Sequence, residues 1–284
     1  MRAACSLLIG VLLAGCPRKT SPTPPISTAP PATALPVGPP FVAPGERMTY
    51  RVSLHAVTLA SFVIEVGDLT TLDGREAIIV QAGASTAGLA AMVKQVSANF
   101  ATWLDPRTGA SLRFRVTESA GAGDETIEQS EARFTDAAGG VFPVSTTLPD
   151  GTATVEKQVY KQTPIDILTF LVSCRAWDGK PGERRSLEVV RSRYMWRTAA
   201  TLAERTTLVT ALGELPAVRF TAVTSRLNRD GSDDTSIEPR EFELWVSDDA
   251  DRVPLAMVAE SDYGNIRLDI VEYAGGKSPN LATP

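Results

Sequence analysis

Short runs of alternating apolar and polar residues fill most of this chain after Gly45. The first run covers residues 47–56, where Met48, Tyr50 and Val52 lie on one face and polar residues lie on the other. Successive side chains of a β-strand point to opposite faces of a sheet, so a period of two indicates a half-buried strand. Similar runs occupy residues 62–66, 186–191, 217–224, 241–246 and 266–272, and a short apolar run occupies residues 77–80. The chain is therefore expected to be mainly β.

Dipeptides that favour tight turns separate several of these runs. They are Asp73-Gly74, Asp150-Gly151, Asp178-Gly179 and Asp230-Gly231. The Asp-Gly pair is typical of the two-residue turns that join antiparallel strands. Short strands at this spacing predict an antiparallel sheet that forms a barrel or half-barrel, with a sandwich as the alternative.

Two segments depart from the alternation and have the spacing of a helix. In residues 88–96 apolar side chains recur every three or four positions. Residues 164–174 begin with Pro164, which is tolerated at a first helical position, and are apolar nearly all round, so a helix here should be buried. We expect two or three short helices, this one packed against the curved sheet. The same apolar run also fits a buried strand, which periodicity does not exclude.

The chain carries weak signs of an internal repeat. Gly45-Glu46-Arg47 opens the first strand and Gly182-Glu183-Arg184 opens a later one. Trp103 and Trp245 are each followed, at the same offsets, by Val, Glu and Ser. Two similar halves could therefore complete one barrel. The identities are few, so a chance similarity stays open as the alternative.

Residues 1–15 have the features of an export signal. An apolar run over residues 7–13 is shorter than the ~20 residues that cross a bilayer and fits the core of a signal peptide. The leader ends in Leu13-Ala14-Gly15-Cys16, which resembles the lipobox of bacterial lipoproteins. That resemblance implies cleavage before Cys16, a lipid on its thiol and, with Pro17 in place of aspartate, an outer-membrane anchor facing the periplasm. The alternative is an ordinary cleaved leader with an incidental cysteine.

A proline-rich segment separates the leader from the alternating runs. Ten prolines fall within residues 17–44. Proline fixes φ and lacks an N–H group, so we expect an extended linker of about 3.1 Å per residue. The expected organisation is a signal peptide (1–15), a disordered linker starting at lipidated Cys16 (16–44), a β-rich domain (45–273) and a flexible tail (274–284).

Composition narrows the classes of function. A net charge of −5 offers no basic surface, so we expect no nucleic-acid partner. His55 is the single histidine, which removes most histidine-based catalysis and most zinc sites. Cys174 is alone in the domain, and its apolar neighbours favour a small buried residue. No nucleophile, phosphate-binding or dinucleotide-binding motif occurs, so we expect no catalytic residue, metal or cofactor, while a pair of carboxylates stays open.

A cluster of cations and aromatic residues is the candidate ligand-binding site. On one continuous strand, Arg191, Arg193 and Arg197 would share a face, with Tyr194 and Trp196 on the other. Guanidinium groups pair with phosphate and carboxylate, so the cluster predicts a site for an anionic glycan or a lipid headgroup. The alternative is an edge strand whose charged side chains face water.

Three motifs together resemble one known family. They are Trp245-Val246-Ser247-Asp248-Asp249 with Arg252 and Pro254, Gly45-Glu46-Arg47-Met48-Thr49-Tyr50, and Trp103-Leu104-Asp105-Pro106. They resemble an exported bacterial family known only as domain of unknown function 3108, over about residues 44–273. The resemblance implies a β-rich, exported domain and brings no established activity or catalytic residue.

These features favour a membrane-anchored envelope lipoprotein whose domain is not an enzyme. Besides the membrane reached through Cys16, the expected partner is an apolar or amphipathic, lipid-like ligand in the mouth of the barrel. A structural or protein-interaction scaffold of the envelope is the alternative, and a carboxylate-based glycan hydrolase is a third. A large apolar cavity would favour the first of these, and a filled sheet would favour the second.

Overall fold

The fold is built on one curved sheet. The computed structural model describes residues 40–121 and 125–277, so the signal peptide, Cys16, most of the linker and the end of the tail lie outside it. Within the described ranges the sheet contains fifteen strands. They are β1 (Arg47–Leu54), β2 (Val57–Leu72), β3 (Arg75–Thr86), β4 (Val96–Leu104), β5 (Ser111–Ala120), β6 (Glu125–Arg133), β7 (Val141–Thr147), β8 (Ala153–Val159), β9 (Ile165–Asp166), β10 (Arg184–Arg191), β11 (Tyr194–Thr210), β12 (Gly213–Leu227), β13 (Arg240–Ser247), β14 (Pro254–Ser261) and β15 (Gly264–Ala274).

The first and last strands pair at the centre of this sheet. The order is β8-β7-β6-β5-β4-β3-β2-β1-β15-β14-β13-β12-β11-β10-β9. Neighbours along this order are antiparallel, except that β9 runs parallel to β10. The chain therefore runs from the centre to one edge, crosses over, and returns to the centre from the other edge.

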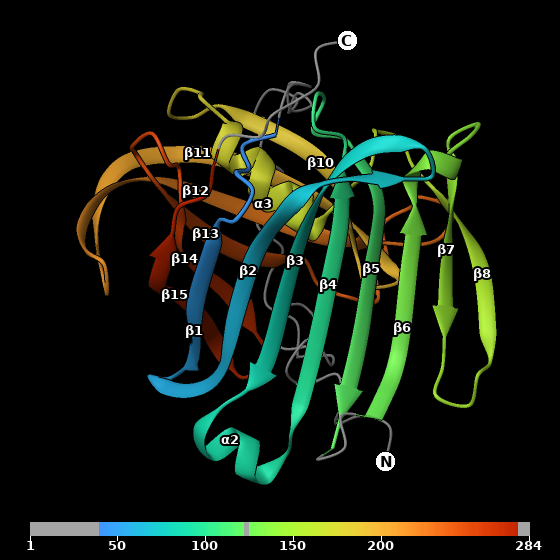
Figure 1. The fold of residues 1–284 in the computed structure, drawn as a ribbon, viewed down its shortest axis with the longest axis horizontal. Helices are drawn as coiled ribbons and strands as arrows, with labels where there is room; N and C mark the ends of the chain where they lie inside the picture. Colours follow the sequence, from blue (N-terminus) through green and yellow to red (C-terminus); the bar gives the residue numbers. More distant parts are fainter. Residues whose placement is uncertain (1–39, 122–124, 278–284) are drawn as a thin grey trace.

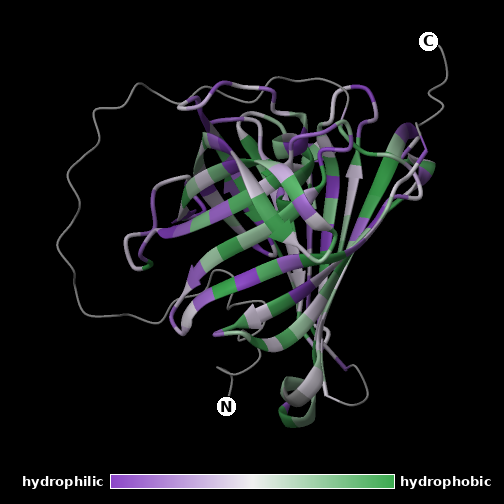
Figure 2. Cartoon of the chain, turned by 90° about the vertical axis from the view of Figure 1, so that its left-hand side faces the viewer, coloured by the Kyte–Doolittle hydropathy of each residue, from purple (hydrophilic) through white to green (hydrophobic). Residues whose placement is uncertain are grey.

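The sheet curls into a half-barrel. In Figure 1, β1 to β8 form the front wall, and β10 to β13 sweep behind them. Strands β8 and β9 are the two ends of the order, so the sheet is not closed. Apolar and polar bands alternate along the strands in Figure 2, as the period of two predicts. The prediction of a mainly β, antiparallel half-barrel is confirmed at this level, and a single sheet takes the place of the sandwich alternative.

Residues with positive φ make the tightest hairpins. At the Asp73-Gly74 turn, φ is 50° and 79°, and the turn joins β2 to β3 as the sequence predicts. His55 and Ala56, with φ of 46° and 65°, form a second such turn. Alternation predicts a strand over residues 47–56, but β1 ends at Leu54 and His55 lies in the turn.

Two α-helices and one 3-10 helix accompany the strands in the described ranges, as predicted in number. They are α2 (Gly88–Val93), α3 (Ile167–Ala176) and η1 (Phe134–Asp136). Figure 1 shows α3 in the hollow of the half-barrel, so the segment is a buried helix and not a strand. The prediction that Pro164 takes the first helical position is wrong, because Asp166 forms a short strand with Ile165 and caps the helix.

The hydrophobic core fills much of the space between α3 and the concave face of the sheet. Leu168 and Val172 pack with side chains of β1, β2, β3 and β14, while Phe170 and Cys174 pack with those of β10 to β13. Cys174 is completely buried, and its burial raises the pKa of the thiol far above the ordinary value. The prediction of a small buried residue is confirmed for Cys174.

The two halves of the chain share details of backbone geometry. At the start of β1, Gly45 donates from its N–H to the carbonyl of Val66 at 2.8 Å, and the Val66 N–H donates to the carbonyl of Glu46 at 2.9 Å. At the start of β10 the same two bonds link Gly182 and Glu183 to Leu202, at 2.8 and 3.0 Å. Irregular pairing follows both Trp103 and Trp245. These matches add support to an ancestral duplication, which stays a prediction.

Candidate functional site

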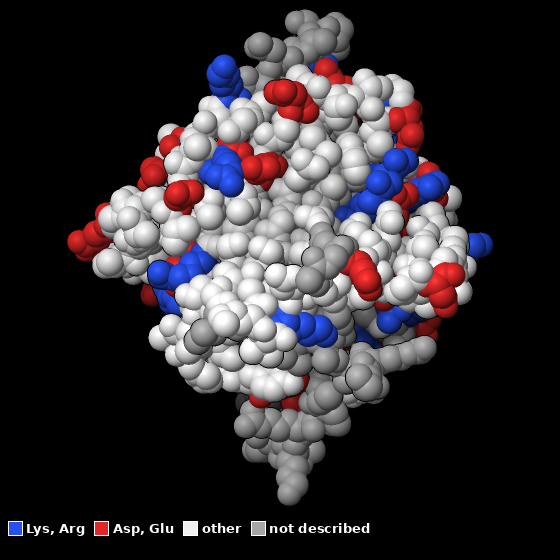
Figure 3. All heavy atoms as spheres, turned by 60° about the horizontal axis from the view of Figure 1, so that its bottom comes forward, with Lys and Arg blue, Asp and Glu red and all other residues white. Residues whose placement is uncertain are grey.

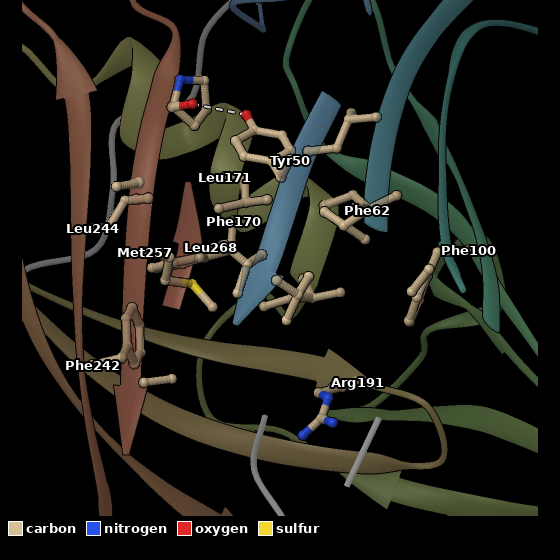
Figure 4. Close-up of a pocket in the computed structure, with 18 of the residues that line it drawn as sticks. Tyr50, Phe62, Phe100, Phe170, Leu171, Arg191, Phe242, Leu244, Met257 and Leu268 are labelled. Atoms are coloured by element: carbon tan, nitrogen blue, oxygen red, sulfur yellow. Dashed lines mark hydrogen bonds between the residues drawn. The ribbon is translucent and has the colours of Figure 1, made fainter. Parts of the chain in front are cut away.

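An apolar cavity lies between α3 and the concave face of the sheet (Figure 4). Its volume is about 130 Å³, within an empty space of about 1160 Å³ that includes the part open to solvent. The walls come from strands of both halves of the chain and from one side of α3. The lining residues are Tyr50, Val52, Ala60, Phe62, Ile64, Ala84, Phe100, Ile167, Leu168, Phe170, Leu171, Arg191, Phe242, Leu244, Pro254, Ala256, Met257, Ala259 and Leu268.

Alanines at inward positions of the strands create much of this space. Ala60, Ala84, Ala256 and Ala259 all line the cavity. A methyl group does not reach the helix opposite, whereas larger apolar side chains close such gaps elsewhere in a core. These alanines were not identified from the sequence. The signal that could have found them is alanine, a poor strand former, at positions where the alternation calls for Val or Ile.

Two polar groups are placed among the apolar walls. The Tyr50 hydroxyl donates a hydrogen bond to the carbonyl of Pro254 at 2.8 Å, so the buried phenol is satisfied and burial raises its pKa. Arg191, at the end of β10, brings a guanidinium group to the side of the cavity away from Tyr50 (Figure 4). Burial lowers the pKa of Arg191 to about 10, against the opposing charge of Glu118, so the group stays cationic at neutral pH.

The other two arginines of the sequence-predicted cluster do not join Arg191. A turn at Ser192, with φ of 51°, separates β10 from β11, so the prediction of one continuous strand face is wrong. Arg193 lies 3.5 Å from a carboxylate oxygen of Glu128. Arg197 pairs with Asp233 and lies 3.8 Å from Glu188. Of the three arginines, Arg191 is the one that lines the cavity.

The N-terminal end of α3 is fixed to the front wall by a buried carboxylate. Asp166 is fully buried. One of its oxygens accepts the backbone N–H groups of Leu168 and Thr169 at 2.9 and 3.0 Å. The other accepts the hydroxyls of Thr102, Ser111 and Thr169 at 2.6, 2.7 and 2.6 Å. Five donors therefore offset the cost of burying this charge.

A buried ion pair fixes the C-terminal end of the same helix. The Arg175 guanidinium donates to both carboxylate oxygens of Glu46, at 2.8 and 2.6 Å. It also donates to the carbonyls of Arg252 and Asp251, at 2.9 and 2.8 Å. The side chains of Arg175 and Glu46 are only 3% and 1% exposed. With both ends fixed, α3 holds its apolar side chains over the cavity without filling it.

The described residues contain no helix that is long and apolar enough to cross a membrane. No curated protein matches the chain. Among solved structures, a β-barrel-like protein of domain of unknown function DUF1849 from Brucella abortus is similar, with a TM-score of 0.52 and 10% identity. The alignment covers 81% of this chain and 97% of that one. At this identity the similarity shows the fold alone.

Two further solved structures are more distant. One is a Bacteroides fragilis protein described as exported, with a YmcC-like fold; the TM-score is 0.36, the identity 6%, and the coverage 85% of this chain and 100% of that one. The other is described as a lipoprotein of Parabacteroides distasonis, with a TM-score of 0.34, 9% identity, and coverage of 83% and 99%.

The sequence itself places the chain in a family. Residues 48–271 match the family described as Protein of unknown function (DUF3108). The match includes both Trp motifs and nearly all strands of the half-barrel. The chain therefore belongs to the DUF3108 family.

Proposed function

We propose that this protein is an envelope lipoprotein, anchored through Cys16 in the outer membrane and facing the periplasm, whose half-barrel binds a lipid-like ligand without catalysis. The ligand lies in the cavity between α3 and the sheet. The observation that carries the proposal is an apolar space that a well-packed domain of this kind would fill with side chains.

The size and chemistry of the cavity support a hydrocarbon chain. An apolar cavity of about 150 Å³ holds benzene, and the cavity of about 130 Å³ here is of similar size and partly open to solvent, so we propose that the rest of a longer chain extends out of it. The walls offer aliphatic and aromatic side chains from Tyr50, Phe62, Phe170 and Met257. The cation of Arg191 suits an anionic or polar head at one side. A free amphipathic molecule therefore matches the cavity better than a polar metabolite.

The alternatives find less support in the same space. A scaffold needs no empty cavity beneath its central helix. A carboxylate-based hydrolase needs acids at the site, and among the cavity-lining residues described here none is Asp or Glu. We therefore favour binding over both alternatives.

The proposal can be tested with a fluorescent fatty acid as the probe. Ala84→Leu and Ala84→Trp enlarge a partly exposed side chain inside the cavity and should weaken probe binding in that order, by about tenfold or more for Trp. Ser85→Trp is the matched control, because the neighbouring side chain is exposed on the opposite face of β3 and contacts Ser61. It should leave binding unchanged.

Three results would contradict the proposal. They are absence of probe binding by the parent protein after delipidation, unchanged affinity in both folded Ala84 variants, and equal loss in Ser85→Trp. Thermal melting of each variant establishes that it is folded.

A further inference from the structure

The helix α2 exposes two apolar side chains at one end of the half-barrel. Met92 is 83% exposed and Val93 is 89% exposed. Figures 1 and 2 show α2 projecting beyond the strand ends, away from α3. Adjacent exposed Met and Val side chains on a projecting helix form an apolar patch that a partner could cover.

Neighbouring turns add apolar and aromatic groups at the same end. Val57 begins β2 after the His55-Ala56 turn and is 54% exposed, and Tyr263 in the β14–β15 turn is 56% exposed. These two turns are joined, because His55 Nε2 lies 3.0 Å from the Tyr263 carbonyl oxygen. We call Met92, Val93, Val57 and Tyr263 the apolar tip.

The tip lies at the rim of the cavity. The N–H group of Ala87, the residue before α2, donates to the Leu59 carbonyl at 2.9 Å. Ala60, next to Leu59, lines the cavity, and so does Ala84, three residues before Ala87. A surface bound to the tip would therefore lie near cavity-lining residues of β2 and β3.

The segment that contains α2 carries one positive charge, whereas the whole chain carries −5. Lys94 follows the helix directly and is exposed, and residues 86–96 contain no Asp or Glu. Seen from this end, the middle of the face is mostly uncharged, with Lys, Arg, Asp and Glu gathered mainly toward its margins (Figure 3). Apolar side chains at the same end of the fold as a lysine and a tyrosine are a combination that suits the interface of an anionic bilayer.

We propose that the apolar tip docks on a phospholipid bilayer that contains anionic headgroups. Met92 and Val93 enter the boundary between headgroups and acyl chains, and Lys94 pairs with phosphate. The cavity rim then faces the bilayer. The inference does not require the cavity to hold lipid, since docking rests on exposed residues outside it.

The proposed linker is long enough for this orientation. The first described residues precede Arg47, at the opposite end of β1 from the His55 turn. Residues 16–39 reach up to about 75 Å as an extended chain, whereas β2, the longest strand of this wall, spans at most ~53 Å. A lipid on Cys16 and the apolar tip can therefore contact the same membrane.

Vesicle co-sedimentation of the mature, unlipidated protein tests the proposal. The chain from residue 16 onward with Cys16→Ser removes the proposed anchor and keeps the whole domain. We expect it to bind vesicles of equal parts phosphatidylcholine and phosphatidylglycerol more tightly than pure phosphatidylcholine vesicles. Met92→Ser with Val93→Ser should weaken binding by about tenfold or more. Lys94→Glu should remove the preference for phosphatidylglycerol.

A matched control uses exposed valines elsewhere. Val209→Ser with Val155→Ser removes apolar side chains that are 75% and 70% exposed on other strands, and should leave vesicle binding unchanged. The proposal is overturned if the parent binds neither vesicle, if the control loses as much as the α2 variant, or if the parent is a dimer that the α2 variant converts to a monomer. Unchanged fatty-acid binding by the α2 variant separates docking from the function of the cavity.

Discussion

Two adjacent residues at the start of β1 make ion pairs with very different roles. Glu46 lies in the core with Arg175, and their side chains are 1% and 3% exposed. Arg47 pairs with Glu65 at 2.8 Å, with side chains that are 50% and 55% exposed. A buried charge that loses its partner has no water to replace it, whereas an exposed charge does. Burial, and not the presence of an ion pair, therefore decides which of the two the fold depends on.

We expect Glu46→Ala to lower the free energy of unfolding by about 3–5 kcal/mol, because it leaves the Arg175 guanidinium buried without its carboxylate. Arg47→Ala, one position along, should cost about 0–1 kcal/mol. Urea denaturation of both variants measures the difference. Similar losses in the two variants would show that the buried pair contributes no more to the free energy of unfolding than the exposed pair.

Glu118, beside the cavity cation, makes stability depend on pH. Burial raises its pKa, as does the charge of Glu128, while Arg191 and Arg193 act in the opposite direction. A pKa raised in the folded state means that folding disfavours the ionised carboxylate. The resulting cost is absent below the unfolded pKa of about 4.3, grows as the pH rises through that value, and is complete above the folded pKa.

Glu118→Gln should therefore raise the melting temperature at neutral pH, and this gain should vanish below about pH 4. Melting curves across this range measure it. Glu125→Gln, at an exposed position of the neighbouring strand, removes the same charge and should give no such pH-dependent gain. A gain that persisted at acidic pH would contradict the assignment to ionisation.

At the scale of elements, α3 shows what a local pattern can and cannot predict. Its apolar composition predicted a buried helix, because a helix that is apolar all round has no face for water. Its start was misplaced at Pro164, since the cap at Asp166 depends on Thr102 and Ser111 from distant strands as well as on its own first turn.

Asp166→Ala should destabilise the protein by roughly 2–5 kcal/mol, because it removes the helix cap and the carboxylate oxygen that three buried hydroxyls share as an acceptor. It should also weaken fatty-acid binding as α3 loses its position. Asp105→Ala is the control. Asp105 likewise accepts two backbone N–H groups, both at 2.9 Å, in an exposed turn, and its loss should cost about 1 kcal/mol. Chemical denaturation measures the loss of stability in both variants, and titration with the fluorescent fatty acid measures the loss of binding.

The strands were more predictable than the site. The alternating runs located β1, β10, β12, β13 and β15 to within a few residues, although four consecutive residues are buried in both β10 and β13. The prediction that the three arginines share one face was wrong, because it treated residues 191–197 as one strand. The chain makes a hairpin turn at Ser192, and no glycine marks that turn in the sequence. No single segment of the sequence could predict the cavity. It arises where alanines from several strands face one helix, and that depends on which strands meet across the sheet.

At the scale of the whole molecule, the open sheet has two edge strands, β8 and β9. The backbone groups along an edge strand can pair with a second chain. β8 is exposed along most of its length and carries Glu156 and Lys157, and charged side chains on an edge discourage pairing with a second chain. β9 is only two residues long, which also limits an edge. The half-barrel therefore stays open while its edges are protected.

The pairing of the first strand with the last determines when this fold can form. Arg47 lies opposite Ala274, and Leu54 lies opposite Ile266. Until the end of the chain has been synthesised, β1 keeps an unpaired edge at what will become the middle of the sheet. Closing so long a loop is slow, and high contact order of this kind delays folding. An incomplete chain is therefore exposed to aggregation, and the fold can be completed only after the whole polypeptide has been synthesised.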